Sequence, residues 1–162
     1  MTDDRQAAQH LAAHAHMVSR ASGREPWRDA VQWLSRGRYG QRTGWPDVPR
    51  LGTPWQDTIS GERHGWRQRA AYLDGHEVFG VDYQVCRRCR LGWVEQPYTV
   101  ERYQRCGLAR AGLAALWADH PGLSWHTLGG HRHASRPFWA AAGTGVPGGY
   151  QQRDVCTHVT TG

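Results

Sequence analysis

The sequence predicts an α/β fold in which a mixed central sheet is flanked by helices and preceded by an N-terminal helical extension. Three observations support this class. Two stretches with helical periodicity come first, three strand-like runs follow one another between residues 67 and 99, and helix-like and strand-like stretches then alternate. With 162 residues, of which 39% are hydrophobic, the chain has the size of one domain. We expect residues 1–60 to form the extension and 61–162 the main domain.

The extension is expected to contain two helices and a long irregular loop. Residues 3–20 have acidic residues at the start and apolar residues spaced by three and four, namely Ala8, Leu11, Ala15 and Val18. A second helix should begin at Pro26, end at Gly37 and bury Trp27, Val31 and Leu34. Residues 37–66 are rich in Gly, Pro and Trp and show no period, which indicates a functional or mobile loop.

The main domain should begin with three antiparallel strands at residues 67–73, 76–86 and 90–99. Asp74-Gly75 is a strong hairpin signal between the first two, and Cys86-Arg-Arg-Cys89 forms the second turn. A helix at 107–119 ends before Pro121-Gly122. A strand at 123–130, a helix at 134–143 and a strand at 150–159 complete the expected order.

Composition limits the possible partners and compartments. The formal net charge is +6, and all 20 basic residues are Arg, which indicates a GC-rich, bacterial genome and leaves nucleic acid or tRNA as an allowed partner. No run approaches the roughly 18 apolar residues of a membrane span, and the first residues do not resemble a secretory signal. We expect a cytoplasmic protein without a membrane partner.

The segment "QRCGLAR", residues 104–110, carries the clearest chemical signal and is called the cradle below. A helix N-terminus presents unpaired N–H groups and a partial positive charge, so it attracts anions. Gly107 allows close approach of a ligand, and Arg105 and Arg110 add charge. The cradle therefore predicts a diphosphate site, although it has neither the Gly-Lys-Ser/Thr of a P-loop nor Gly-x-Gly-x-x-Gly.

The cradle and its surroundings resemble the GNAT superfamily of acyl-CoA-dependent N-acyltransferases over about residues 67–159. Gln104 to Ala109 fit the family's Gln/Arg-x-x-Gly-x-Gly/Ala signature, a strand precedes them, and "RPFWAAAG" is similar to a late family helix. The resemblance implies a GNAT-like fold that binds acetyl-CoA as co-substrate. The implied contacts are Tyr98 and Val100 for the pantetheine arm, and Gln104, Arg105, Cys106, Gly107, Leu108, Ala109 and Arg110 for the pyrophosphate.

The resemblance also implies catalytic residues, with one departure from the family. Glu95, on the strand before the cradle, is the expected base, although a Glu that faces solvent or pairs with Arg is an equally good interpretation. The family's Phe-Tyr pair is Phe138-Trp139 here, and an indole is no acid, so either Tyr150 or Tyr98 protonates the thiolate or CoA leaves as the thiolate with the help of solvent. His131 and His133 are alternative bases.

Cysteine spacing predicts a second site. Cys86, Cys89, Cys156 and His158 form the donor set of a tetrahedral structural zinc site, and a final strand antiparallel to its neighbours would bring the two pairs to one edge. A redox pair or four inert thiols remain alternatives. Cys106 is expected to be a packing residue.

Two functions follow from these patterns. The first is an N-acetyltransferase that moves an acyl group from acetyl-CoA to an amine, with the acceptor and the oligomeric state undetermined. The alternative is a zinc-stabilised nucleic-acid-binding module with a vestigial CoA cradle, which the basic charge favours.

Overall fold

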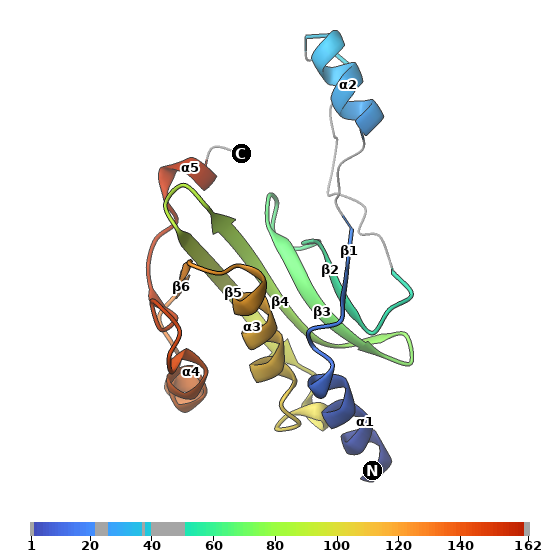
Figure 1. The fold of residues 1–162 in the computed structure, drawn as a ribbon, viewed down its shortest axis with the longest axis vertical. Coiled ribbons are helices and arrows are strands. Elements are labelled where there is room, and N and C mark those ends of the chain that lie inside the picture. The colour runs from blue at the N-terminus through green and yellow to red at the C-terminus, as the bar shows by residue number, and fades with distance from the viewer. Residues whose placement is uncertain (1, 22–25, 37, 40–50, 161–162) are drawn as a thin grey trace.

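The computed structural model describes residues 2–21, 26–36, 38–39 and 51–160, and its strands form one seven-stranded sheet (Figure 1). Its helices, including two single 3₁₀ turns, are α1 (Thr2–Ala13), α2 (Pro26–Leu34), η1 (Glu101–Tyr103), α3 (Leu108–Asp119), η2 (His133–Ser135), α4 (Arg136–Gly143) and α5 (Thr157–Thr160). Its strands are β1 (Val18–Arg20), β2 (Trp55–Ile59), β3 (Arg67–Leu73), β4 (His76–Cys86), β5 (Leu91–Thr99), β6 (Ser124–Thr127) and β7 (Gln151–Gln152).

The strands lie in the sheet in the order in which they occur in the chain. β2, β3, β4 and β5 are antiparallel, whereas β1 pairs with β2, β5 with β6 and β6 with β7 in parallel. The predicted class, a mixed sheet flanked by helices, is confirmed. The hairpin at Asp74-Gly75 is also present, and both residues have positive φ, at 49° and 77°.

α1 and α3 lie side by side over one face of the sheet, where they close the main core (Figure 1). Gly112 faces the sheet in α3, and a Cβ added there would lie 2.5 Å from the ring of Phe79. The missing side chain thus lets α3 pack closely on β4. Trp55 fills the space between α1 and the sheet and donates its indole N–H to the carbonyl of Leu11 at 2.8 Å. These contacts hold α1 and α3 against the sheet.

The N-terminal predictions need correction. The first helix ends at Ala13 rather than residue 20, and Val18 belongs to β1. The irregular loop contains β2, which the sequence did not predict. α2 forms where a helix was expected, but the side chains of Val31 and Leu34 are 40% and 73% exposed rather than buried. Burial of the Trp27 side chain, like the predicted helix end at Gly37, lies outside the described residues.

The predicted final strand is also wrong in length and direction. Only Gln151 and Gln152 pair with β6, and they do so in parallel rather than antiparallel. The chain then leaves the sheet and ends in α5, which contacts β4 near the turn into β5 (Figure 1). No helix in the described ranges is both long enough and apolar enough to cross a membrane.

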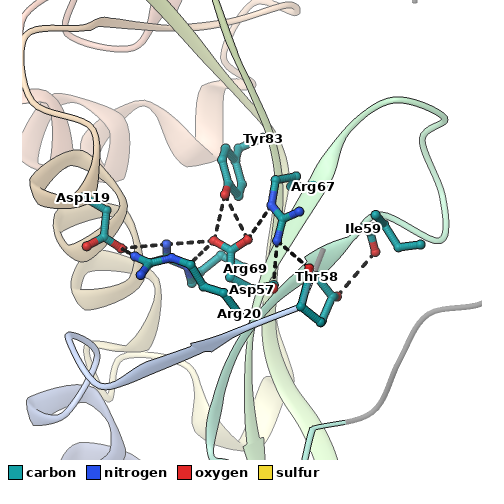
Figure 2. A network of polar contacts seen from close by, with 9 residues as sticks. Arg20, Asp57, Thr58, Ile59, Arg67, Arg69, Tyr83 and Asp119 are labelled. Carbon is teal, nitrogen blue, oxygen red and sulfur yellow. Dashed lines mark hydrogen bonds and ion pairs between the residues drawn. The ribbon is translucent and has the colours of Figure 1, made fainter. Parts of the chain in front are cut away.

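A buried ion-pair network explains why the polar strand β2 lies inside the protein (Figure 2). Asp57 on β2 and Arg69 on β3 are both fully buried, and two nitrogens of Arg69 donate to Asp57 Oδ2 at 3.1 and 2.8 Å. Tyr83 on β4 donates its hydroxyl to the same carboxylate. Burial and the adjacent carboxylate raise the pKa of Tyr83, so it remains a proton donor.

The network extends to β1, which pairs with β2 in the sheet, and to α3. Arg67 donates Nε to Asp57 Oδ1 at 2.7 Å, and Arg69 also reaches Asp119 Oδ2 on α3 at 2.8 Å. Arg20 on β1 pairs with the same Asp119 oxygen at 2.6 Å. Burial alone would raise the pKa of Asp119, but hydrogen bonds from Arg69 and Arg20 outweigh it and lower the pKa. Charged side chains thereby join β1, β2, β3 and α3, and the Tyr83 hydroxyl adds β4.

Candidate functional site

A cleft opens where the parallel strands β5 and β6 separate. The two strands are paired only from Leu91 to Trp93 on β5 and from Ser124 to His126 on β6. Beyond these pairs lies a cleft of about 1080 Å³. The cleft is bounded by β5, the cradle, the segment after β6, and α4, with Glu95, Tyr98, Gln104, Arg105, Gly107, Ala109, Arg110, Thr127, His131, Arg132, Phe138 and Trp139 in its lining.

A bulge interrupts β5 beyond the residues that pair with β6. Asp82 pairs with Glu95 and Gly80 with Tyr98, so β5 carries one more residue than β4 across this interval. Gln96, inside the interval, has φ of 49°, which fits the local kink. A bulge leaves one residue outside the hydrogen-bonded ladder, and both Gln96 and Pro97 line the cleft. The bulge therefore shapes the cleft wall and leaves backbone groups available there.

The cradle combines two left-handed residues with an uncapped helix. Arg105 has φ of 63° and Gly107, which immediately precedes α3, has φ of 88°. No side chain caps the N-terminus of α3. The Gln104 side chain ties the cradle to the end of β5, because its Nε2 donates to the carbonyl of Thr99 at 3.2 Å. In turns with left-handed residues, successive backbone N–H groups point into one concavity that can bind an anion. This end of the cleft is therefore suited to a phosphate group.

Seven of the nine predicted cofactor residues line the cleft: Tyr98, Gln104, Arg105, Gly107, Leu108, Ala109 and Arg110. Val100 and Cys106 do not line it. The amide of Val100 continues the sheet by donating to the carbonyl of Val78 at 3.0 Å. Cys106 is 6% exposed within the main core, which agrees with its interpretation as a packing residue. Arg132, which the sequence did not single out, adds a third arginine to the lining.

Glu95 lies in the cleft lining and spans the separation of the two strands. Its Oε1 accepts hydrogen bonds from the backbone N–H groups of Leu128 at 2.6 Å and Gly129 at 3.3 Å. Its Oε2 lies 3.7 Å from the guanidinium of Arg63. These contacts, called the Glu95 bridge below, replace strand pairing that ends at Trp93. Glu95 thus lies on the strand before the cradle, as predicted, and it also connects β5 to the segment after β6.

Tyr150 does not line the cleft. It is 1% exposed in the main core, with its ring 5.3 Å from the ring of Trp139, and burial raises its pKa. Trp139 itself lines the cleft and stacks on His131 at 4.8 Å with an interplanar angle of 12°. His131 Nε2 lies 3.3 Å from Thr127 Oγ1. His131, one of the alternative bases, is therefore a held imidazole inside the cleft.

Tyr98 is the tyrosine that is most accessible in the cleft lining, with 45% exposure. Its hydroxyl donates to Glu77 Oε1 at 2.9 Å. Burial and this carboxylate raise the pKa of Tyr98, so the phenol keeps its proton near neutral pH.

The second predicted site is brought together at the turn between β4 and β5. Cys86, Cys89, Cys156 and His158, called the Cys/His cluster below, place one ligand atom each within 4.8 Å of all the others. They are close enough to hold a metal ion. None of these cysteines forms a disulfide, and Cys89 Sγ lies 3.2 Å from His158 Nδ1.

The thiols of the Cys/His cluster influence each other's protonation. The backbone N–H of Cys89 holds the pKa of Cys86 below its ordinary value. The thiol of Cys156, followed by desolvation, raises the pKa of Cys89 to about 11. One thiolate is thus favoured among neighbouring thiols, and a cation would be needed for several to ionise together.

The cleft and the Cys/His cluster are thus the two candidate sites among the described residues. Comparisons of the chain with protein-family models, curated proteins and solved structures gave no match.

Proposed function

We propose that the protein is an N-acyltransferase of GNAT type that transfers an acetyl group from acetyl-CoA to an amine. The observation that carries the proposal is the meeting of two features: a cleft between separating parallel strands, and an uncapped helix N-terminus at one end of it. The cleft has the volume of a cofactor site, and the cradle has the polarity for a pyrophosphate. The sequence resemblance supports the same assignment.

In this proposal the cradle binds the pyrophosphate through the amides around Arg105 and Gly107, with Arg105, Arg110 and Arg132 as charged neighbours. The pantetheine arm lies along the free side of β5 beyond Trp93, where β6 no longer pairs. The thioester then reaches the bulge at Gln96. Orientation of the amine beside the thioester would supply most of the acceleration, as much as ~7 kcal/mol.

The transfer has a simple balance of bonds. The amine nitrogen attacks the thioester carbonyl, the new C–N bond forms, the C–S bond breaks, and CoA leaves with the electron pair on sulphur. The amine proton goes to a base in the cleft. Glu95 is the predicted base and has Oε2 free of the backbone amides, while His131, a half-buried residue of the cleft lining, is a second candidate. Tyr98 is the phenol available to protonate sulphur, and Tyr150 has no part in this scheme.

The metal expected from the sequence has no part in the transfer either. The Cys/His cluster lies outside the residues that line the cleft. An ion held there, which we propose to be zinc, would have a structural role only.

Calorimetric titration tests the function against the nucleic-acid-binding alternative. The protein is titrated with acetyl-CoA and, separately, with a short duplex and with tRNA, each at low and moderate salt. We expect micromolar binding of acetyl-CoA, and nucleic-acid binding that weakens steeply with salt. Absence of acetyl-CoA binding together with salt-resistant nucleic-acid binding would overturn the proposal in favour of the alternative.

A further inference from the structure

We infer that Cys86, Cys89, Cys156 and His158 bind one zinc ion and that this ion fastens the C-terminal segment to the hairpin of β4 and β5. The inference is independent of the acyltransferase proposal. It starts from a spatial coincidence, because the two pairs of ligands are far apart in the chain and come from unrelated elements. Cys86 ends β4, Cys89 lies in the following turn, and Cys156 and His158 flank the start of α5.

The donor set selects the metal. Three thiolates and one imidazole in a tetrahedron are the ligands of closed structural zinc sites. Zn–S bonds of about 2.3 Å and Zn–N bonds of about 2.0 Å place neighbouring ligand atoms roughly 3.5–3.8 Å apart. The ligand atoms here all lie within 4.8 Å of one another, so small side-chain rotations suffice to close the site. Carboxylates, which calcium and magnesium prefer, are absent from the set.

The nitrogen of His158 that would bind the metal can be assigned from the same geometry. His158 Nδ1 lies 3.2 Å from Cys89 Sγ, so Nδ1 is the atom that faces the cluster. Three thiolates around Zn²⁺ leave one net negative charge, and the turn carries Arg87, Arg88 and Arg90 beside it. Positive charge in the same turn would favour this anionic, metal-bound form.

The cluster has the surroundings of a structural site. Cys86 is 6% exposed and packs with the buried side chains of Leu91 and Trp93. Val155 and Val159 cover this small apolar group from the C-terminal side. All four coordination positions are filled by the protein, which leaves none for a substrate or an activated water. The site is therefore a structural metal site rather than a catalytic one.

The C-terminal segment has few other attachments. β7 contains two residues and α5 contains four, so neither supplies much backbone hydrogen bonding. Between them, the carbonyl of Arg153 accepts the indole N–H of Trp93 at 3.0 Å, and its amide donates to the carbonyl of Thr127. Free energy of zinc binding would thus become free energy of ordering for residues 153–160.

Metal content and stability test the inference on the full chain. Protein purified without chelator should contain about one zinc per chain by elemental analysis. Cys86→Ser and Cys156→Ser should each reduce the zinc content at least tenfold and lower Tm, and the double variant should resemble either single one. Cys106→Ser is the matched control for Cys86→Ser, because both cysteines are 6% exposed but Cys106 lies outside the cluster; its zinc content should equal that of the parent.

Two further measurements separate metal loss from a simple folding defect. A strong chelator should lower the Tm of the parent to that of Cys156→Ser and leave the variant unchanged. Cobalt added to the metal-free parent should give thiolate-to-cobalt charge-transfer absorption that zinc abolishes, and Cys106→Ser should do the same. A parent that contains no metal and whose Tm is indifferent to zinc and chelator would overturn the inference. So would cobalt spectra that are unaffected by Cys156→Ser.

Discussion

The carboxylate of Glu95 on β5 accepts a hydrogen bond from the backbone N–H of Leu128 at 2.6 Å, across the gap where β5 and β6 cease to pair. The Glu95 side chain therefore links β5 to the segment that follows β6, where the two strands are no longer paired. A residue that the sequence marks as a base is also a structural support, and mutation can separate the two roles.

Glu95→Gln keeps an acceptor oxygen for Leu128 and Gly129 but removes the carboxylate that would accept the amine proton, whereas Glu95→Ala removes both. We expect Glu95→Ala to lower the free energy of unfolding by about 1–3 kcal/mol, because two backbone N–H groups lose their partner. Glu95→Gln should cost less. Urea unfolding gives both values, and acetyl-transfer rates report the chemistry.

The transfer rate of Glu95→Gln decides whether Glu95 acts as the base. If Glu95 is the base, Glu95→Gln should lower the transfer rate at least a hundredfold while acetyl-CoA affinity stays near the parent value. An unchanged rate in Glu95→Gln would leave His131 as the base and reduce Glu95 to its bridging role.

Gly107→Glu should abolish acetyl-CoA binding, since it places a bulky anion where the pyrophosphate is proposed to lie. Strain must be separated from charge, because Gly107 has φ of 88° and any other residue is disfavoured there. Gly107→Ala is the control: its Cβ would lie 3.9 Å from the Cβ of Ala12, which is ordinary contact, so its cost is about 1 kcal/mol of backbone strain. Calorimetry should show weak loss of affinity for the Ala variant and full loss for the Glu variant. Equal binding by all three proteins would contradict the cradle.

Asp57→Ala should be among the most damaging substitutions in the protein. It leaves the fully buried Arg69 without the carboxylate that pairs with two of its nitrogens. Breaking a buried ion pair from one side costs about 3–5 kcal/mol. Tyr83→Phe removes one donor to the same carboxylate and should cost about 1 kcal/mol. Chemical unfolding measures both, and a cost below ~1 kcal/mol for Asp57→Ala would show that Asp57 is dispensable.

Stability should fall as the pH decreases below neutrality, partly through His120. Burial lowers the pKa of His120, and the positive charges of Arg87 and Arg69 add to this effect. The unfolded chain then binds the proton more readily, so the contribution of neutral His120 is present above about pH 6.5 and is lost as the pH falls through the folded-state pKa. His126, whose pKa burial also lowers, acts in the same direction.

His120→Phe isolates this contribution. The ring lies between Tyr83 and Trp125, and its Nδ1 is buried without a hydrogen-bond partner among the described residues, so Phe should be tolerated. We expect the free energy of unfolding to fall less in His120→Phe than in the parent between about pH 7.5 and about pH 5.5. Subtracting the two curves cancels proton effects on metal binding. Parallel curves would show that His120 does not titrate in this window.

Strong local signals predicted much of the sheet and of the cleft. Strand-like runs and turn residues in 67–99 predicted three strands nearly to the residue, and the glycine before an Ala/Leu run predicted the start of α3 to within one residue. These signals are local, because a turn or a helix N-terminus is determined by neighbouring residues. The cradle was predictable for that reason.

The missed elements depend on contacts that are distant in sequence. β2 contains Gln56, Asp57 and Thr58, all buried, and nothing nearby indicates that Arg69 and Tyr83 will compensate the charge. The exposed apolar side chains of α2 show the opposite case, in which a regular apolar stripe does not lead to burial. The Glu95 bridge likewise requires a residue that lies 33 positions downstream.

The strand order of the sheet, which follows the chain without interruption, also sets a sequence of events during synthesis. β2 to β5 are antiparallel neighbours and can pair as each leaves the ribosome, since every partner is already present or comes next. Cys86 and Cys89 emerge with this first unit, but Cys156 and His158 follow the last strand. Closure of the Cys/His cluster is therefore a late step, available only to a chain whose α3, β6 and α4 have been made, and a bound ion would mark translation through the whole sheet.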